Sequence, residues 1–222
     1  MSSVQSRDVK MKFCGITRPE DAEAAISSGA AMLGLNFYPA SPRHITLERA
    51  QQIADAVAGR ARLVGVFVNM NLSGIRQIAR AVPLDCIQLH GDELREECTE
   101  LAGDFEVIRA IQVTPQFRPD ELAAYACCRG LLLDAPSPQH GGSGQSFDWH
   151  NIDWPAIREA APWAELYLAG GLTAENVAEA IRIVRPDVVD VASGIEESKG
   201  IKSAMKMRAF ATAVQAAGRE VR

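Results

Sequence analysis

Short hydrophobic runs alternate along the chain with longer segments in which apolar residues recur at helical spacing. The short runs are rich in β-branched and aliphatic residues and end at Gly, Asn, His or Asp, as strands do. The segments between them predict helices. We expect eight strands, at Met11–Ile16, Met32–Phe37, Arg62–Val68, Cys86–His90, Glu106–Val113, Gly130–Asp134, Leu166–Gly170 and Val188–Ser193.

The eight strand and helix units leave little sequence for a second domain. If residues 1–10 form a polar tail, residues 11–222 give roughly 27 residues to each unit, close to the minimum for a strand, a helix and two connections. Alternating strands and helices indicate parallel strands. We therefore predict an α/β protein made of a tail, residues 1–10, and a single (β/α)8 TIM barrel, residues 11–222.

An open, doubly wound sheet is the alternative architecture. In its dinucleotide-binding form it carries Gly-x-Gly-x-x-Gly after the first strand. This chain has Cys14-Gly15-Ile16-Thr17 at that place. We therefore expect no nucleotide cofactor.

Threonines stand at three of the expected helix starts. Thr17 is followed three residues later by Glu20, which is the pattern of a capping box. Thr46 and Thr173 are placed where a side chain can cap a first helical turn. The repeated order of strand, cap and helix supports the register of the eight units.

Side chains alternate between the two faces of a strand, so placing apolar residues against the helices decides which residues point into the barrel. Buried polar groups cost about 1–3 kcal/mol each unless they are paired, so a polar interior indicates a functional site rather than core. In barrel enzymes the carboxyl ends of the strands carry the chemistry. By this parity the polar residues that point inward are Lys12, Cys14, Asn36, Gln88, His90 and Asp134.

Two glycine segments in the last two units indicate a phosphate site. Ala169-Gly170-Gly171 precedes a helix start, and Ala192-Ser193-Gly194 closes the eighth strand. Backbone N–H groups exposed by glycines bind dianions, and barrels commonly place a phosphate at the loops after strands seven and eight. Together the two segments predict a phosphorylated small-molecule ligand.

Charge argues against nucleic acid and anionic membranes as partners. The chain has 23 Lys and Arg against 28 Asp and Glu, a formal net charge of −5, and 47% hydrophobic residues. There is no basic excess to neutralise phosphate groups. No apolar run approaches the roughly 20 residues of a membrane-spanning helix, and residues 1–10 do not resemble a signal peptide.

Cysteine usage indicates a reducing compartment. The five cysteines are odd in number, Cys127 and Cys128 are adjacent, and no Cys-x-x-Cys pair occurs. This pattern argues against a disulfide framework and against a structural zinc site. We expect a cytoplasmic protein without a bound metal.

Nine short motifs follow one another in order from residue 12 to about residue 200. They are Lys12-Phe13-Cys14-Gly15-Ile16-Thr17, Ser41-Pro42-Arg43, Val64-Gly65-Val66-Phe67-Val68-Asn69, Gln88-Leu89-His90-Gly91, Leu132-Leu133-Asp134, Gly141-Gly142-Ser143-Gly144, Phe147-Asp148-Trp149, Ala169-Gly170-Gly171-Leu172 and Asp190-Val191-Ala192-Ser193-Gly194. In this order they resemble the phosphoribosylanthranilate isomerase family of tryptophan biosynthesis. The resemblance implies a (β/α)8 barrel and a cofactor-free Amadori rearrangement of N-(5'-phosphoribosyl)anthranilate to a 1-deoxyribulose 5-phosphate.

The resemblance implies that Cys14 is the general base and Asp134 the general acid. Asp134 would protonate the furanose ring oxygen and open the ring to a Schiff base, and Cys14 would then remove the proton from C2'. No electron sink beyond the protonated imine is required. Cys14 acts as a base only as a thiolate, whose pKa is near 8.5 in a free thiol, so we hypothesise that Lys12 or a helix terminus activates it.

Binding roles follow from the same resemblance. Arg43 matches the residue that pairs with the anthranilate carboxylate, for which a planar fork of donors is suited. The phosphate cradle corresponds to Gly170, Gly171, Ser193 and Gly194, and the expected lining comprises Lys12, Asn36, His90, Gly142 and Asp190. The glycine-rich connection 135–147 is long for a small barrel and is interpreted as a substrate-covering loop.

Two positions depart from the family pattern. Ala192 stands where the family usually has Ser, which could remove a hydroxyl near the phosphate. Asn36 occupies an inward position that is usually apolar, which could alter the aromatic pocket.

Other phosphosugar barrels are the rival enzymes. An aldolase would use Lys12 as a Schiff-base amine, but Lys12 lies two residues below Cys14, too deep to meet a sugar carbonyl. A metal-dependent epimerase would need His90, Asp134 and Asp190 to converge on one ion. The related isomerase of histidine biosynthesis uses paired Asp residues, and Cys14 in the base position argues against it.

A protein of another class, a non-catalytic phosphate sensor or an assembly partner, is also compatible with the fold. Loss of activity usually removes the acid or the base first, whereas Cys14, Asp134 and Arg43 are all present. The sequence does not distinguish a monomer from a homodimer.

Overall fold

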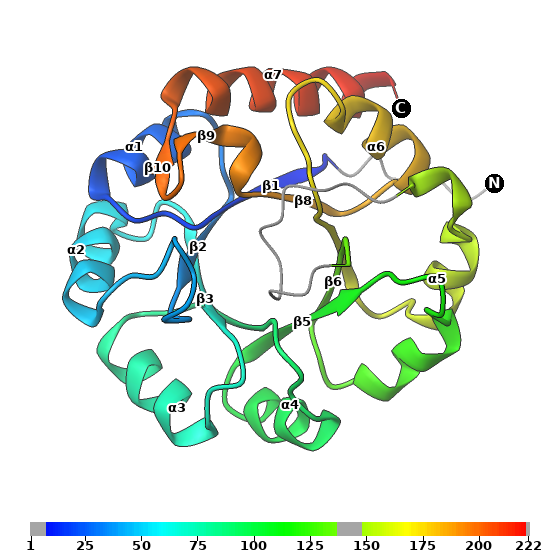
Figure 1. The fold of residues 1–222 in the computed structure, drawn as a ribbon, viewed down its shortest axis with the longest axis horizontal. Coiled ribbons are helices and arrows are strands. Elements are labelled where there is room, and N and C mark those ends of the chain that lie inside the picture. Colours follow the sequence, from blue (N-terminus) through cyan, green and yellow to red (C-terminus); the bar gives the residue numbers. More distant parts are fainter. Residues whose placement is uncertain (1–7, 137–147, 221–222) are drawn as a thin grey trace.

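The computed structural model describes residues 8–136 and 148–220. Within this part of the chain, eight parallel strands close into a barrel in the order in which they occur in the sequence (Figure 1). The prediction of a (β/α)8 barrel is confirmed. The strands are β1 (Lys10–Cys14), β2 (Met32–Asn36), β3 (Arg62–Phe67), β4 (Cys86–Leu89), β5 (Glu106–Gln112), β6 (Gly130–Asp134), β7 (Glu165–Leu168) and β8 (Val188–Val191).

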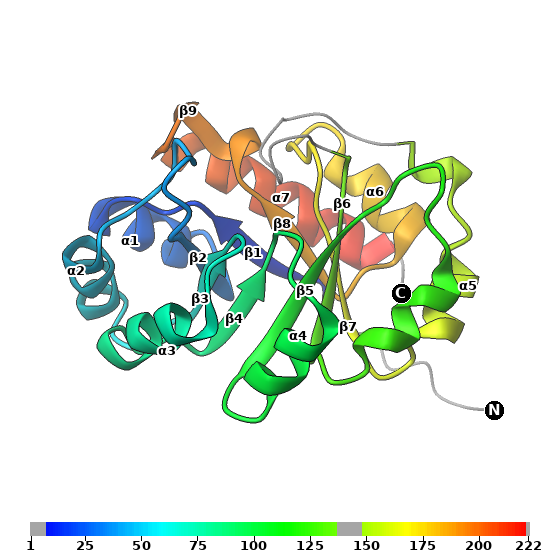
Figure 2. The same ribbon diagram turned by 60° about the horizontal axis from the view of Figure 1, so that its bottom comes forward.

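Helices surround the barrel (Figure 1). Those described are α1 (Pro19–Ser27), α2 (Leu47–Val57), α3 (Leu72–Ala81), α4 (Arg95–Ala102), α5 (Trp154–Ala160), α6 (Val177–Val184) and α7 (Ala204–Glu220), with short 3₁₀ helices η1 (Pro119–Tyr125), η2 (Trp149–Asn151) and η3 (Ser193–Ile195). The connection between β5 and β6 therefore contains a 3₁₀ helix where the repeat pattern predicts an α-helix. After β8, an antiparallel hairpin of β9 (Glu196–Ser198) and β10 (Ile201–Lys202) lies beyond the carboxyl end of the strand (Figure 2).

Several predicted strands are longer than the observed ones. β1 ends at Cys14 because Gly15 adopts a positive φ of 73°, which leaves the extended conformation. β7 ends at Leu168, before Gly170 and Gly171, whose φ angles are also positive. At the other end β1 begins at Lys10, so this residue belongs to the barrel rather than to the tail. Residues 1–7 lie outside the described part of the chain.

The three predicted threonine caps have different outcomes. Thr46 caps α2 as expected, because its side chain accepts a hydrogen bond from Arg49 N at 3.2 Å. Thr173 Oγ1 accepts from Glu175 N at 3.3 Å in a turn that precedes the first residue of α6. The capping box at Thr17 is wrong: α1 starts one residue later, and the Thr17 hydroxyl instead donates to the carbonyl of Gly200 in the hairpin.

The core has two layers, and they confirm the predicted parity. Leu131 and Leu133 lie in the layer between strands and helices, and Leu132 points into the barrel. The interior of the barrel is filled by Met32, Val64, Cys86, Ile108, Ala110, Leu132, Tyr167, Ala169 and Val188. Lys12 and Gln88 lie in register with Met32 and Ile108 of this apolar interior. Cys14 and Asp134 are the last residues of their strands, at the carboxyl end of the barrel.

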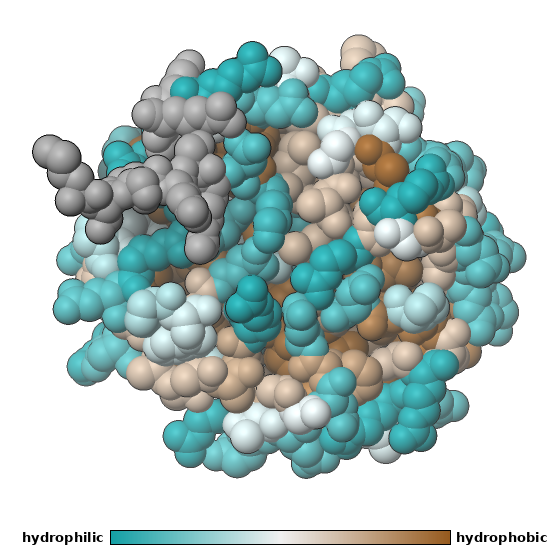
Figure 3. All heavy atoms as spheres, turned by 180° about the vertical axis from the view of Figure 1, so that it is seen from behind, coloured by the Kyte–Doolittle hydropathy of each residue, from teal (hydrophilic) through white to brown (hydrophobic). Residues whose placement is uncertain are grey.

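The surface is mostly polar on the side opposite to the view of Figure 1. Figure 3 shows polar side chains around the rim of this face and apolar side chains in several small areas nearer its middle. None of the described helices is long and apolar enough to cross a membrane. All five cysteines are free thiols.

Candidate active site

Strand β1 places two inward side chains one above the other. Lys12 is completely buried, and its Nζ donates to Asp190 Oδ1 on β8 at 2.8 Å. Cys14 ends the strand and is partly exposed. A Cβ atom added to Gly34 on the neighbouring β2 would lie 2.7 Å from Cys14 Sγ, so the glycine makes room for the thiol. Because Lys12 is buried and paired, it cannot reach a sugar carbonyl as an aldolase lysine would.

The surroundings of Cys14 raise the pKa of its thiol, whereas the sequence analysis expects Lys12 or a helix terminus to lower it. Burial is the largest effect and raises the pKa of the Cys14 thiol, whereas the cations of Lys12 and Lys202 lower it. The Asp190 carboxylate raises it further. Burial lowers the pKa of Lys12, but Asp190 and Cys14 together outweigh burial, so the pKa of Lys12 is raised and it keeps its charge. The prediction that Lys12 helps the thiolate is right in sign, but the net pKa of Cys14 is raised, not lowered.

Asp134 lies at the end of β6 and is held at both carboxyl oxygens. Oδ1 accepts a hydrogen bond from Ala135 N at 2.8 Å, and Oδ2 lies 3.2 Å from His90 Nε2. On the other side of the ring, His90 Nδ1 lies 2.7 Å from Gln88 Nε2. A Cβ atom on Gly170 would lie 3.2 Å from Asp134 Oδ1, so the carboxyl group borders the predicted phosphate loop.

Arg43 lies between β2 and α2 and is held by a residue that the sequence analysis does not single out. Its Nε and Nη2 donate to the two carboxylate oxygens of Glu196 on β9 at 2.7 and 2.9 Å. Lys202 on β10 donates to the same carboxylate at 3.0 Å. The Arg43 side chain packs over Gly15, where any Cβ atom would collide with it. Glu196 and the hairpin thereby fix Arg43 beside Cys14.

The charged groups of this cluster shift one another's pKa. Burial raises the pKa of Glu196, but the hydrogen bond from Arg43 and the charge of Lys202 outweigh burial, so the pKa is lowered. Burial lowers the pKa of Lys202, and Glu196 opposes that shift without cancelling it, so the pKa is lowered. Glu196 is thus an anion between two cations, and the cluster carries a net positive charge close to the thiol.

The two glycine segments meet as predicted. Gly171, Ser193 and Gly194 line one cavity of about 370 Å³, together with Thr173 and Lys206. Gly194 packs so closely on the carbonyl of Leu172 that a Cβ atom would collide with it. Gly170 does not line this cavity but lies beside Asp134. Loops after β7 and β8 therefore form a glycine-lined hollow with Lys206 and Glu175 at its wall.

Asn36 and Gly142 complete the predicted set. Asn36 Oδ1 accepts from Tyr38 N at 2.8 Å, and its carbonyl accepts from Ile45 N at 3.0 Å. It therefore shapes the loop that carries Arg43. Gly142 and residues 137–147 of the predicted covering loop lie outside the described residues.

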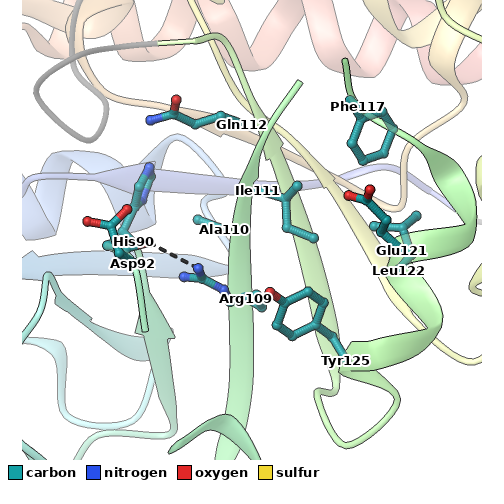
Figure 4. A pocket seen from close by; sticks show the side chains of 11 residues that line it. His90, Asp92, Arg109, Ala110, Ile111, Gln112, Phe117, Glu121, Leu122 and Tyr125 are labelled. Carbon is teal, nitrogen blue, oxygen red and sulfur yellow. Dashed lines mark hydrogen bonds between the residues drawn. The ribbon is translucent and has the colours of Figure 1, made fainter. Parts of the chain in front are cut away.

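A second cavity, of about 400 Å³, lies beside the barrel mouth (Figure 4). Figure 4 shows β5 in the middle, His90 and Asp92 on one side of it and the η1 residues Glu121 and Tyr125 on the other. Arg109 on β5 is buried and paired with a glutamate of the β4–α4 connection. Among the residues that the structure describes, no group of three His, Cys, Asp or Glu side chains is placed to hold a metal ion.

Comparison with known proteins identifies the family to which this chain belongs. The profile of the family described as "N-(5'phosphoribosyl)anthranilate (PRA) isomerase" matches residues 11–213. The N-(5'-phosphoribosyl)anthranilate isomerase of Ralstonia nicotianae is 41% identical over 214 residues, which cover 94% of this chain and 93% of the relative. That of Nitrosococcus oceani is 44% identical over 203 residues, which cover 90% and 95%.

Solved structures agree with the sequence relatives. Phosphoribosyl anthranilate isomerase from Thermotoga maritima superposes with a TM-score of 0.86 at 39% identity, covering 94% of this chain and 99% of that chain. Another structure, of a phosphoribosyl anthranilate isomerase in complex with reduced 1-(o-carboxyphenylamino)-1-deoxyribulose 5-phosphate, has a TM-score of 0.83 at 36% identity, with the same coverage. With its closed barrel, its thiol and carboxyl group at the mouth and its glycine-lined hollow, the chain belongs to the N-(5'-phosphoribosyl)anthranilate isomerase family.

Proposed function

We propose that this protein converts N-(5'-phosphoribosyl)anthranilate into 1-(2-carboxyphenylamino)-1-deoxyribulose 5-phosphate by acid–base catalysis, in the cytoplasm and without a cofactor. The observation that carries the proposal is the placement of Cys14 and Asp134 at the carboxyl ends of β1 and β6 of one barrel. Two proton-transfer groups on separated strands can act on two sides of a small sugar. Turnover of the anthranilate substrate tests the proposal.

The first step uses the carboxyl group. Protonated Asp134 gives its proton to the furanose ring oxygen, the C1'–O bond breaks, and the anthranilate nitrogen supplies the electron pair that forms the protonated imine. Asp134 is 7% exposed, so the transfer takes place in a site that largely excludes water. Asp134 lies beside Gly170, next to the loop that we propose binds the phosphate end of the sugar.

The second step uses the thiol. The Cys14 thiolate removes the proton from C2', the electron pair of the C–H bond forms the C1'=C2' double bond, and the imine electrons return to nitrogen. The enolamine then becomes the ketone when C1' takes up one proton and the hydroxyl group on C2' loses another, so that the product has the same composition as the substrate. The net positive charge of Lys12, Lys202 and Arg43 around the thiol favours its anionic form, against the effect of burial.

Substrate binding engages the two ends of the molecule. A solved relative binds a reduced 1-(o-carboxyphenylamino)-1-deoxyribulose 5-phosphate, which carries a carboxylate and a phosphate. In this chain the hollow of Gly171, Ser193 and Gly194 offers backbone N–H groups to the phosphate. Arg43 Nη1 makes no hydrogen bond to any described residue, so its two N–H groups are available to the anthranilate carboxylate.

Replacing Arg43 with Lys is expected to weaken substrate binding. Lysine keeps the charge but loses the fork that lets Glu196 hold one side while the substrate takes the other. A charged hydrogen bond contributes about 1.5–3 kcal/mol, so KM should rise by roughly 10- to 100-fold, with a smaller change in kcat. Initial rates over a range of substrate concentrations measure both constants. An unchanged KM would remove Arg43 from the binding site.

Replacing Lys12 with Met is expected to raise the pKa of Cys14. Lys12 lowers the thiol pKa and Asp190 raises it, so losing the cation leaves both burial and the carboxylate to disfavour the thiolate. The rise of kcat/KM with pH should then move to higher pH. The pH dependence of Cys14 alkylation measures the same shift directly, with Cys14→Ala as background. Lys12→Arg keeps the charge and serves as the control. The same pH profile in the wild type, Lys12→Met and Lys12→Arg would contradict the assignment of Lys12 as a group that lowers the pKa of Cys14.

A further inference from the structure

Three side chains form a hydrogen-bonded line from the barrel interior to the candidate acid. Gln88 lies on β4, points inward and is completely buried. Its Nε2 atom lies 2.7 Å from His90 Nδ1, and His90 Nε2 lies 3.2 Å from Asp134 Oδ2. The neighbours of Gln88 in strand register, Val66 and Ile108, are apolar and buried, so packing alone does not require an amide at this position.

The orientation of the Gln88 amide decides which nitrogen of His90 carries the proton. When the Gln88 amide N–H donates to His90 Nδ1, a neutral ring carries its proton on Nε2 and donates it to Asp134 Oδ2. Ala135 N donates to the other oxygen, Oδ1, at 2.8 Å. Both carboxyl oxygens then accept hydrogen bonds. This arrangement stabilises the carboxylate of Asp134, the form that remains after it has given up its proton.

The Gln88 side chain contains an unsatisfied group that points to a second arrangement. Its Oε1 atom is buried and has no hydrogen-bond partner among the described residues. Half a turn of the amide exchanges Oε1 and Nε2 and places the carbonyl oxygen against His90 Nδ1. Nδ1 must then carry the proton, Nε2 becomes an acceptor, and the protonated Asp134 Oδ2–H can donate to it. This second arrangement stabilises the acid.

We propose that Gln88 is a positioning residue that selects the tautomer of His90 and so keeps Asp134 hydrogen-bonded in both of its protonation states. The inference rests on the proposed role of Asp134 as the general acid. The amide acts through the imidazole and does not touch the substrate.

Proton balance requires His90 to exchange protons with solvent. After Asp134 has given its proton to the sugar, His90 loses the proton on Nδ1 and gains one on Nε2, so the ring stays neutral while the amide turns. The imidazole is 13% exposed and lines the cavity of about 400 Å³ beside the barrel mouth (Figure 4). That cavity gives the ring a route to solvent that Gln88 and Asp134 do not line.

The test compares Gln88→Met with Ile108→Met in the full-length protein. Methionine fills the volume of glutamine but does not form its hydrogen bond to His90. Ile108→Met places the same side chain at the inward residue that lies in register with Gln88, and Ile108 makes no side-chain hydrogen bond to His90. The tautomer of His90 is measured by ¹⁵N NMR of the ligand-free protein above pH 6.5, the ordinary pKa of about 6.5 for imidazole. His90→Asn identifies its signals among those of the four histidines.

The wild-type protein should show His90 protonated on Nε2, and Gln88→Met should show a mixture of tautomers. In Gln88→Met, kcat should fall at least about tenfold, the alkaline limb of its pH profile should move, and KM should stay within about twofold of wild type. Ile108→Met should keep the wild-type tautomer and pH profile.

Three results would overturn the proposal. The first is a wild-type His90 ring protonated on Nδ1 or on both nitrogens. The second is a Gln88→Met protein that keeps the wild-type tautomer or pH profile. The third is an Ile108→Met protein that shows the changes in tautomer and pH profile expected for Gln88→Met. The NMR measurement uses no substrate. If the wild-type protein fails to turn over the anthranilate substrate, that result refutes the isomerase assignment, and the tautomers still decide whether Gln88 controls His90.

Discussion

Replacing Asp134 with Asn is expected to lower kcat by roughly 10²- to 10⁴-fold, the usual contribution of a general acid. Asparagine has the same shape, and its oxygen can still accept the hydrogen bond that Ala135 N donates to Oδ1. Its amide can still reach His90. The variant therefore keeps the geometry but has no acidic proton for the ring oxygen of the sugar.

The measurement is single-turnover loss of anthranilate fluorescence with enzyme in excess, so that slow product release does not hide the chemical step. The thermal unfolding midpoint of Asp134→Asn serves as the control for folding. A variant that binds the substrate and turns it over within tenfold of the wild-type rate would show that another group supplies the proton.

Replacing Cys14 with Ala is expected to cause a loss of similar size, roughly 10²- to 10⁴-fold in kcat. Alanine removes the base and leaves Lys12 paired with Asp190, so the electrostatic frame stays in place. Because burial raises the pKa of the thiol, only a minority of Cys14 is thiolate at neutral pH. The wild-type kcat/KM should therefore increase with pH through the neutral range, and this increase should be absent from the residual activity of Cys14→Ala.

Cys127→Ala is the matched control, since Cys127 is also a partly exposed thiol but lies in the connection between η1 and β6. It should keep the wild-type rate and pH profile. Equal losses in Cys14→Ala and Cys127→Ala would mean that the thiol at the barrel mouth is not the base.

Strand periodicity predicts the part of the site that the barrel itself positions. Apolar residues that must face the helices leave Lys12, Gln88, His90 and Asp134 no direction but inward, and the structure places all four there. The glycines that follow the seventh and eighth strands meet because parallel strands end at one rim of the barrel. The alternation of side chains along a strand is enough to predict the direction of the strand residues, since it depends only on local backbone geometry.

The alternation of side chains along a strand does not predict contacts between segments that are distant in the sequence. Glu196 and Arg43 are 153 residues apart, and many other acidic residues could have paired with the arginine. Thr17 has the spacing of a helix cap, yet its hydroxyl bonds to Gly200, 183 residues away, while Pro19 begins the helix. Tertiary contacts outweigh local preference at both places.

The pKa of Cys14 could not be predicted because it is a difference between opposing effects. The sequence shows that a lysine lies nearby, which favours the thiolate. Burial and the Asp190 carboxylate depend on how the barrel closes, and they favour the thiol. Only the three-dimensional arrangement shows that burial is the largest of them.

We expect this chain to isomerise N-(5'-phosphoribosyl)anthranilate without a metal. The most direct measurement is the loss of anthranilate fluorescence when freshly prepared substrate meets the wild-type protein with EDTA present throughout. We predict a decay far faster than the spontaneous breakdown of the substrate, with the ketose phosphate as the product. A decay no faster than the spontaneous one, despite binding of a phosphorylated ligand, would contradict the acid–base roles of Cys14 and Asp134 and leave only a barrel with a phosphate site.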